Sequence, residues 1–143
     1  MNTFSASIDK FTQKAQDRIV SVPRASILDL FGLIVLATPV GNPEIWARNA
    51  APANYVGGRL RGNWNLSLNR IDKSTTKTTD KNGVKVTQKS NKGMRNFKGE
   101  TVYISNHLPY ALSVEKRHST QAPAGMLAVS VAQWKRIVKG NAK

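Results

Sequence analysis

The feature that most constrains the fold of this chain is an apolar segment that ends abruptly at a Thr-Pro pair. Residues 23–37 are almost entirely apolar beyond their first turn, which predicts a core helix covered on most sides. Pro39 disfavours the α region for Thr38 and lacks an N–H, so we expect the helix to end at Thr38. Pro23 fits the first turn, where its missing N–H costs nothing. Gly32 inside the helix costs roughly 1 kcal/mol relative to Ala and indicates close approach of another backbone.

A separate helix is predicted before Pro23, over residues 3–20, within an N-terminal helix or arm that spans 1–22. One narrow apolar stripe runs along it at spacings of three and four: Phe4, Ile8, Phe11, Ala15 and Ile19. The remaining positions are mostly polar. A stripe this narrow indicates either a surface helix or an arm that packs on a neighbour.

Strands are predicted after the core helix. Gly57 and Gly58 tolerate positive φ and suit a tight turn into residues 59–68. Alternate side chains in that stretch would face opposite sides of a sheet: Leu60, Trp64, Leu66 and Leu68 on one side, and Arg59, Arg61, Asn63, Asn65 and Ser67 on the other. A further strand is expected at 101–105. We also expect a short helix at 110–114, a strand at 126–131 and a helix at 131–139.

Residues 41–56 form a long excursion between the core helix and the first strand. Loops of this length are usually functional or disordered. Trp46 and Tyr55 favour a packed loop, because large aromatic side chains gain much from burial. A single helical turn is predicted around 44–48.

Residues 69–100 are polar and strongly basic. Asn82-Gly83 is a typical hairpin turn, and the flanking alternation is weak. We therefore predict a flexible, β-hairpin-like basic arm inserted in the domain, whose removal would spare folding. Its cations are Arg70, Lys73, Lys77, Lys81, Lys85, Lys89, Lys92, Arg95 and Lys98.

The chain has 143 residues and a net charge of +14. This length predicts one domain over 1–143, and the charge predicts attraction to nucleic acid or to an acidic protein surface. The absence of cysteine excludes disulfides and thiolate catalysis. The start of the chain does not have the pattern of a signal peptide, and the longest apolar run, Leu30–Ala37, is too short to span a bilayer. We expect a soluble protein.

Catalytic signatures are missing from the sequence. The two histidines, His107 and His118, lie in a turn and in a basic patch, and the acidic residues are few and scattered. Neither Gly-x-Ser-x-Gly nor His-Glu-x-x-His occurs, and no pattern of metal ligands is present. Residues 57–62 could offer N–H groups to an anion, but they lack the P-loop pattern, and a simple turn is the favoured interpretation. We expect no enzyme, no cofactor and no metal.

Several motifs, in this order, resemble the neck or tail-completion proteins of tailed bacteriophages, which join head to tail. They are Thr38-Pro39-Val40, the stretch 58–64 (GRLRGNW), the stretch 103–111 (YISNHLPYA), Glu115, and the stretch 121–126 (QAPAGM). The order and spacing hold over residues 22–131. The excursion after Val40 and the Lys-Arg pair after Glu115 depart from the common pattern of that family.

The resemblance implies an α+β fold, with N-terminal helices on a small, mostly antiparallel sheet and long loops. It also implies a non-enzymatic virion protein that is made in the host cytoplasm and forms a ring with copies of itself. Its partners would be the head connector or portal-side proteins and the tail proteins, with non-specific contact to genomic DNA and no membrane. The alternative is a basic, non-enzymatic nucleic-acid-binding module. Candidate subunit or DNA contacts are Trp46, Tyr55, Arg59, Arg61, Lys73, Lys77, Lys81, Lys85, Lys89, Lys92 and Arg95.

Overall fold

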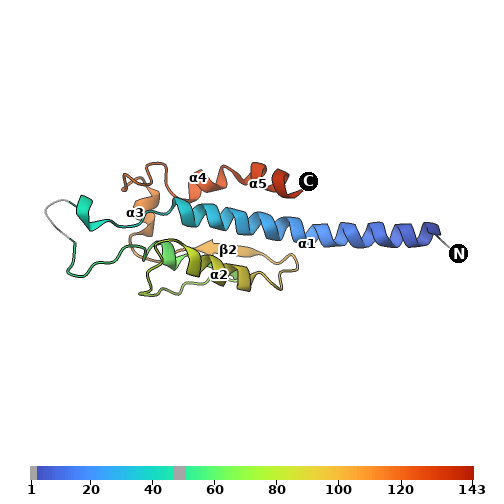
Figure 1. Ribbon diagram of the computed structural model, residues 1–143, viewed down its shortest axis with the longest axis horizontal. Coiled ribbons are helices and arrows are strands. Elements are labelled where there is room, and N and C mark those ends of the chain that lie inside the picture. The colour runs from blue at the N-terminus through green and yellow to red at the C-terminus, as the bar shows by residue number, and fades with distance from the viewer. Residues whose placement is uncertain (1–2, 47–50) are drawn as a thin grey trace.

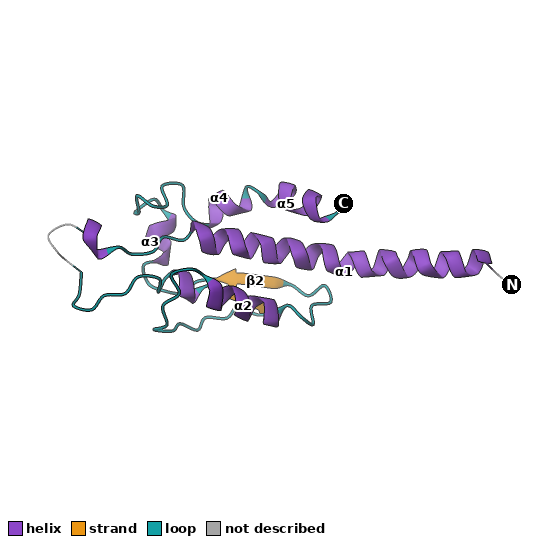
Figure 2. Cartoon of the chain, in the orientation of Figure 1, coloured by secondary structure: helices purple, strands orange, loops and turns teal. Residues whose placement is uncertain are grey.

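The computed structural model describes residues 3–46 and 51–143. Its spine is the long helix α1 (Thr3–Ala37). Helices α4 (Leu127–Val131) and α5 (Trp134–Asn141) lie along one side of α1, and the sheet and helix α2 (Val84–Gly93) lie on the other (Figures 1 and 2). The N-terminal part of α1 projects beyond this body (Figure 1).

The sheet pairs β1 (Asn65–Leu68) with β2 (Val102–Ser105) in antiparallel register, with Asn65 opposite Ser105 and Leu68 opposite Val102. The short helix α3 (Ala111–Glu115) follows, and the 3₁₀ turns η1 (Pro43–Ile45) and η3 (Arg61–Asn63) lie in the loops. This arrangement confirms the predicted α+β class with an N-terminal helix on a small antiparallel sheet.

The core lies where the second half of α1 meets the elements on both of its sides. Its buried cluster includes side chains from α1, the 60–64 turn, α2, and the loops around α3 and α4. The members are Phe31, Ile34, Val35, Leu60, Trp64, Val86, Leu108, Ala111, Ala122 and Met126. α1 ends at Ala37, one residue before Thr38, as the Thr-Pro pair predicted.

The predicted break at Pro23 is wrong, because α1 is continuous from Thr3 to Ala37. Proline removes one hydrogen bond and crowds the carbonyl four residues earlier, here that of Ile19. The turn around Ile19 is exposed, with 69% of the residue accessible. Water can therefore bond the freed carbonyl, which lowers the cost of the interruption.

The first strand is shorter than predicted. Residues 61–63 form η3, and only Asn65–Leu68 pair with β2. Gly58 has φ of +101°, which turns the chain sharply before it reaches the sheet. Asn63 and Asn65 are buried rather than solvent-facing, because loop 72–78 covers them. Asn63 Nδ2 donates to Thr76 O at 3.0 Å and Asn65 Nδ2 to Ser74 O at 2.9 Å.

The predicted β-hairpin-like arm is also wrong. Gly83, with φ of +73°, starts α2 instead of closing a hairpin. An added Cβ there would lie 2.4 Å from Val35 Cγ1, so glycine brings α2 against α1. Val86, Ser90, Met94 and Phe97 are buried, at spacings of three and four. The weak alternation of Val84 and Val86 concealed this helical face.

The strand predicted at 126–131 is the helix α4. Ser130 Oγ donates to Met126 O at 2.8 Å within it. The predicted strand 101–105 and the short helix at 110–114 are confirmed as β2 and α3, within a residue at each end. The helix predicted at 131–139 is confirmed as α5, with its bounds shifted to Trp134–Asn141.

Candidate functional site

The motifs that carry the family resemblance meet at the C-terminal end of α1. Thr38 Oγ1 donates to Ile34 O at 2.7 Å and accepts a bond from Trp64 Nε1 at 2.7 Å. Asn106 Nδ2 donates to Leu60 O at 2.8 Å, which ties the segment after β2 to the same turn. These bonds lie in the buried or half-buried interior. These motif residues therefore act as a scaffold that joins the end of α1 to the following turn and to the segment after β2.

Arg61, predicted as a subunit or DNA contact, is part of this scaffold. Its Nη2 donates to Thr38 O at 2.7 Å and to Leu36 O at 3.2 Å, and its Nη1 donates to Lys81 O. Carbonyl groups at the end of a helix lack partners inside the helix, and a cation there is favourable. Burial lowers the pKa of Arg61, partly offset by the charge of Asp80. Arg61 thus joins the end of α1 to the segment before α2.

Glu115 fixes the last third of the chain. Its Oε2 accepts bonds from the N–H groups of Met126 at 2.7 Å and Leu127 at 2.8 Å, and its Oε1 accepts one from Ala128 at 3.0 Å. Burial raises the pKa of Glu115, but the three N–H donors outweigh burial and leave that pKa below its ordinary value. Gly125 has φ of +85°, and an added Cβ would lie 2.7 Å from Glu115 Oε1.

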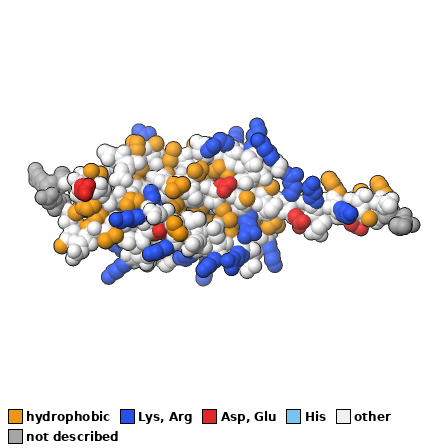
Figure 3. Space-filling model, viewed as in Figure 1, with side chains coloured by type: hydrophobic (Ala, Val, Ile, Leu, Met, Phe, Trp, Pro, Cys, Tyr) orange, Lys and Arg blue, Asp and Glu red, His pale blue; other side chains and the backbone are white. Residues whose placement is uncertain are grey.

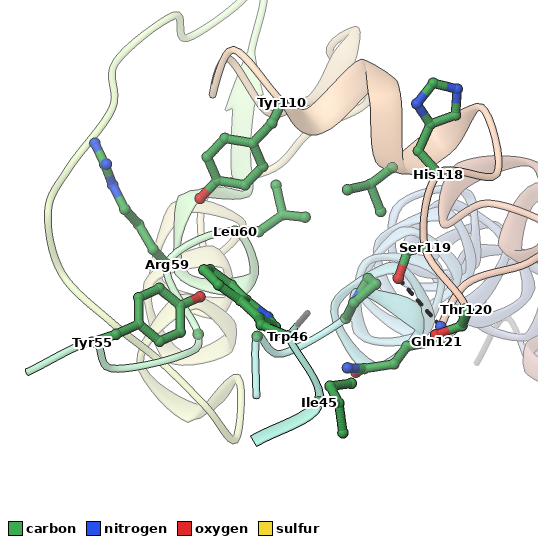
Figure 4. Close-up of a pocket in the computed structure, with 14 residues that line it drawn as sticks. Ile45, Trp46, Tyr55, Arg59, Leu60, Tyr110, His118, Ser119, Thr120 and Gln121 are labelled. Carbon is green, nitrogen blue, oxygen red and sulfur yellow. Dashed lines mark hydrogen bonds between the residues drawn. The ribbon is translucent and has the colours of Figure 1, made fainter. Parts of the chain in front are cut away.

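Trp46, Tyr55 and Arg59, three other predicted contacts, come together at the end of the body opposite the projecting helix. The Trp46 and Tyr55 rings lie 4.8 Å apart at 49°, and Arg59 Nε donates to Thr76 O at 3.3 Å. They line a cavity of about 370 Å³ with Tyr110 and His118 on its far side (Figure 4). Burial raises the pKa of Tyr110. Residues 47–50, which include the last two positions of the turn predicted around 44–48, lie outside the described residues.

The described lining of this cavity includes no carboxylate. A nucleophile, a base and a group that orients the base must converge for hydrolytic catalysis, and this lining does not supply them. Within 3–46 and 51–143, no group of three or more His, Cys, Asp or Glu residues could hold a metal ion. The expectation of a non-enzymatic protein without metal or cofactor stays a prediction.

Except for half-buried Arg61, the predicted cationic contacts are exposed, but those in residues 69–100 do not lie on a free arm. Lys85, Lys89 and Lys92 share the outer face of α2, opposite buried Val86 and Ser90. Hydrogen bonds from Ser74 lower the pKa of Asp72, and the nearby charges of Lys89 and Arg70 lower it further. The remaining cations lie in the loops beside α2: Lys73, Lys77, Lys81 and Arg95.

Most of the apolar stripe of the N-terminal helix is exposed, which fits both predicted alternatives, a surface helix and an arm. The exposed fraction is 76% for Phe4, 73% for Phe11 and 69% for Ile19. Figure 3 shows hydrophobic side chains along this thin projecting end. Arg18 Nη2 donates to Ala142 O, which ties this part of α1 to the C-terminal end of the chain. We call residues 3–17 the N-terminal arm, and its apolar stripe continues to Ile19 at the base of the arm.

By length and composition α1 could also cross a bilayer. An 18-residue window has a mean hydropathy of 1.9, and 22% of that window is buried. Core helices of soluble proteins pass the same criterion, and the second half of α1 carries core residues such as Phe31 and Ile34. Arg24 and Asp29 also lie in that half, and charged side chains inside a bilayer are costly.

Comparisons of the chain with protein-family profiles, curated proteins and solved structures gave no significant match.

Proposed function

We propose that this protein is a structural subunit of the neck of a tailed bacteriophage. Copies of it form a ring that joins the head connector to the tail. The observation that carries this proposal is the N-terminal arm, which projects from the folded body with its apolar stripe uncovered. Large apolar side chains in an exposed contiguous row mark an interaction surface.

The placement of the sequence motifs adds support. Thr38, Arg61, Trp64, Asn106 and Glu115 make hydrogen bonds that hold the ends of helices and loops in place. Such hydrogen bonds preserve the fold. A set of motifs that includes such scaffold residues suits an assembly subunit whose partners are set by its surfaces.

Deleting the gene from the virus that encodes the protein tests the proposal by electron microscopy. We expect filled heads lying beside separate tails, and normal virions when the wild-type chain is supplied in trans. Supplying the triple variant Phe4→Gln/Phe11→Gln/Ile19→Gln should fail to restore virions. The matched control, Leu112→Gln/Val131→Gln, changes exposed apolar residues on the body and should restore them. Normal virions from the deletion alone would contradict the proposal.

A nucleic-acid-binding module remains the second candidate, because one observation favours it. The exposed face of α2 carries Lys85, Lys89 and Lys92, and α2 contains no acidic residue. Protein–DNA interfaces are much more positive than protein–protein interfaces. Contacts from such a row would be to phosphates and insensitive to base sequence.

A further inference from the structure

An open groove runs along α1 between α2 and α5. It has a volume of about 590 Å³. Leu28, Leu33 and Leu36 of α1 and Ile137 of α5 give it apolar walls, and Leu36 is 65% exposed. Gly32 also lines the groove, and nothing lies within 4 Å of the position where its Cβ would be. No part of the chain that the structure describes therefore makes the close approach that the sequence predicted at Gly32.

We propose that this groove receives the N-terminal arm of a neighbouring copy, with the apolar stripe seated on Leu33 and Leu36. Binding of an amphipathic helix in an apolar groove is a recurrent mode of recognition. The missing side chain of Gly32 allows the arriving backbone to approach closely. The inference rests on the proposed function, because it supplies the contact that a ring of identical subunits needs.

The arm cannot fill the groove of its own chain. Both features belong to α1, which is one continuous helix from Thr3 to Ala37. Figure 1 shows the arm pointing away from the body along the same axis. Within one copy, the stripe and the groove are therefore held apart. A contact between different patches of two copies is heterologous, and such contacts close into rings or continue as filaments.

Charge also favours the arm as the occupant. Residues 1–17 contain Asp9, Asp17, Lys10 and Lys14, so their net charge is zero and the whole +14 of the chain lies in residues 18–143. Two bodies that carry this charge repel each other. A neutral helix avoids that repulsion when it docks on the body of the next copy.

The amount of surface fits a stable contact. Each buried phenylalanine contributes roughly 150–250 Å², so Phe4 and Phe11 together supply several hundred Å². A standard interface buries about 800 Å² on each partner. The arm therefore provides much of one interface, and adjoining parts of the bodies can provide the rest.

Cysteine cross-linking tests the seating directly, because the chain has no cysteine of its own. Copies that carry Ile8→Cys, Phe11→Cys or Ile19→Cys are each mixed with copies that carry Leu33→Cys, and the mixtures are oxidised at high protein concentration. We expect at least one pair to give a disulfide-linked dimer of the two variants. In the matched control, Leu112→Cys replaces Leu33→Cys at an exposed apolar site on α3. Cross-linking no stronger than this control in all three pairs would overturn the inference.

A groove-filling variant provides an independent check. Gly32→Leu adds a side chain into open space and removes a residue with low helix propensity, so the free subunit should fold with a melting temperature no lower than that of the wild type. The same variant should abolish the arm-to-groove cross-link. An undiminished cross-link would contradict the inference. A membrane as the occupant of the stripe would contradict it too: wild-type protein would then float with anionic phosphatidylserine vesicles, and replacement of Phe4 and Phe11 would abolish the flotation.

Virions separate this inference from the proposed function. If the cysteine pairs are built into virions that contain the protein but do not cross-link, the seating is wrong and the neck role stands. If virions contain none of the protein, the neck role fails whatever the purified subunits do.

Discussion

The indole Nε1 of Trp64 donates to the hydroxyl of Thr38 at 2.7 Å, and both residues are almost completely buried. The same hydroxyl donates to Ile34 O at 2.7 Å, within the last turn of α1. One threonine therefore ends the long helix and orients the largest aromatic side chain of the core. Thr38 Oγ1 therefore links the C-terminal end of α1 to the turn that carries Trp64.

Thr38→Val removes the hydroxyl with little change of volume and leaves the buried Trp64 N–H without its partner. We expect a loss of about 1–3 kcal/mol of unfolding free energy, the cost of an unsatisfied buried donor. Trp64→Phe removes that donor, so the double variant should lose less than the sum of the single losses. Denaturant unfolding of all four proteins measures the coupling. Additivity within about 0.5 kcal/mol would mean that the bond is not energetically important.

Met94 is fully buried just after α2, in the segment that the sequence predicted as a dispensable arm. Met94→Ala should lower the unfolding free energy by about 2–5 kcal/mol, because it removes a large side chain from a closed core. Val84→Ala on the exposed start of α2 should change it by less than about 0.5 kcal/mol. Removal of residues 72–96 should now abolish folding. A stable, soluble deletion protein would show that the segment is not part of the core.

The parts of the fold that sequence reasoning predicted have local causes. Pro39 stops α1 through its own ring geometry, and the β-branched and aromatic residues of 102–105 make a strand by their own preference. The parts that it missed have distant causes. α2 consists largely of residues with modest helix propensity. Its buried face packs on α1 and β1, and this packing stabilises the helix. α4 alternates like a strand, but Glu115 bonds the N–H groups at its start.

The candidate surfaces also include one with a local cause, which the sequence could predict, and one with distant causes, which it could not. The stripe of Phe4, Phe11 and Ile19 is periodic within one helix, so the sequence could predict it as one face of a surface helix or of an arm. The groove could not be predicted, because its walls come from α1, α2 and α5, which are far apart in sequence. The one sequence feature that pointed to the groove is Gly32, which predicted close approach of another backbone. The carbonyl bonds of Arg61 could not be predicted either, because a guanidinium that bonds helix-end carbonyls has the same sequence signature as one that contacts an anion.

Glu115 should make stability depend on pH in the acid range. Its pKa in the folded protein lies below the ordinary value of 4.5, because three N–H donors favour the charged form. The stabilisation is therefore complete above pH 4.5 and is lost as the pH falls through the lower pKa of the folded state. In Glu115→Gln this contribution is absent at every pH.

Urea unfolding of the wild type and Glu115→Gln between pH 3 and 7 measures this contribution. The wild type should be the more stable protein at neutral pH, and the difference should shrink as the pH falls below 4.5. The control Glu44→Gln, at an exposed position in η1, should show no such convergence. A difference that stays constant with pH would mean that the carboxylate charge does not hold α4.

The nucleic-acid alternative makes a prediction that net charge alone does not. Lys85→Gln/Lys89→Gln/Lys92→Gln on α2 and Lys135→Gln/Arg136→Gln/Lys139→Gln on α5 each remove three exposed charges. If the α2 face binds phosphates, only the α2 variant should weaken the salt dependence of duplex DNA binding. The slope of log K against log salt concentration should become less negative by about 2.7, or about 0.9 for each lost phosphate contact. Fluorescence anisotropy across a salt series provides both slopes. Equal losses in the two variants would indicate diffuse attraction to a cationic body and would leave the ring role as the better explanation of the molecule.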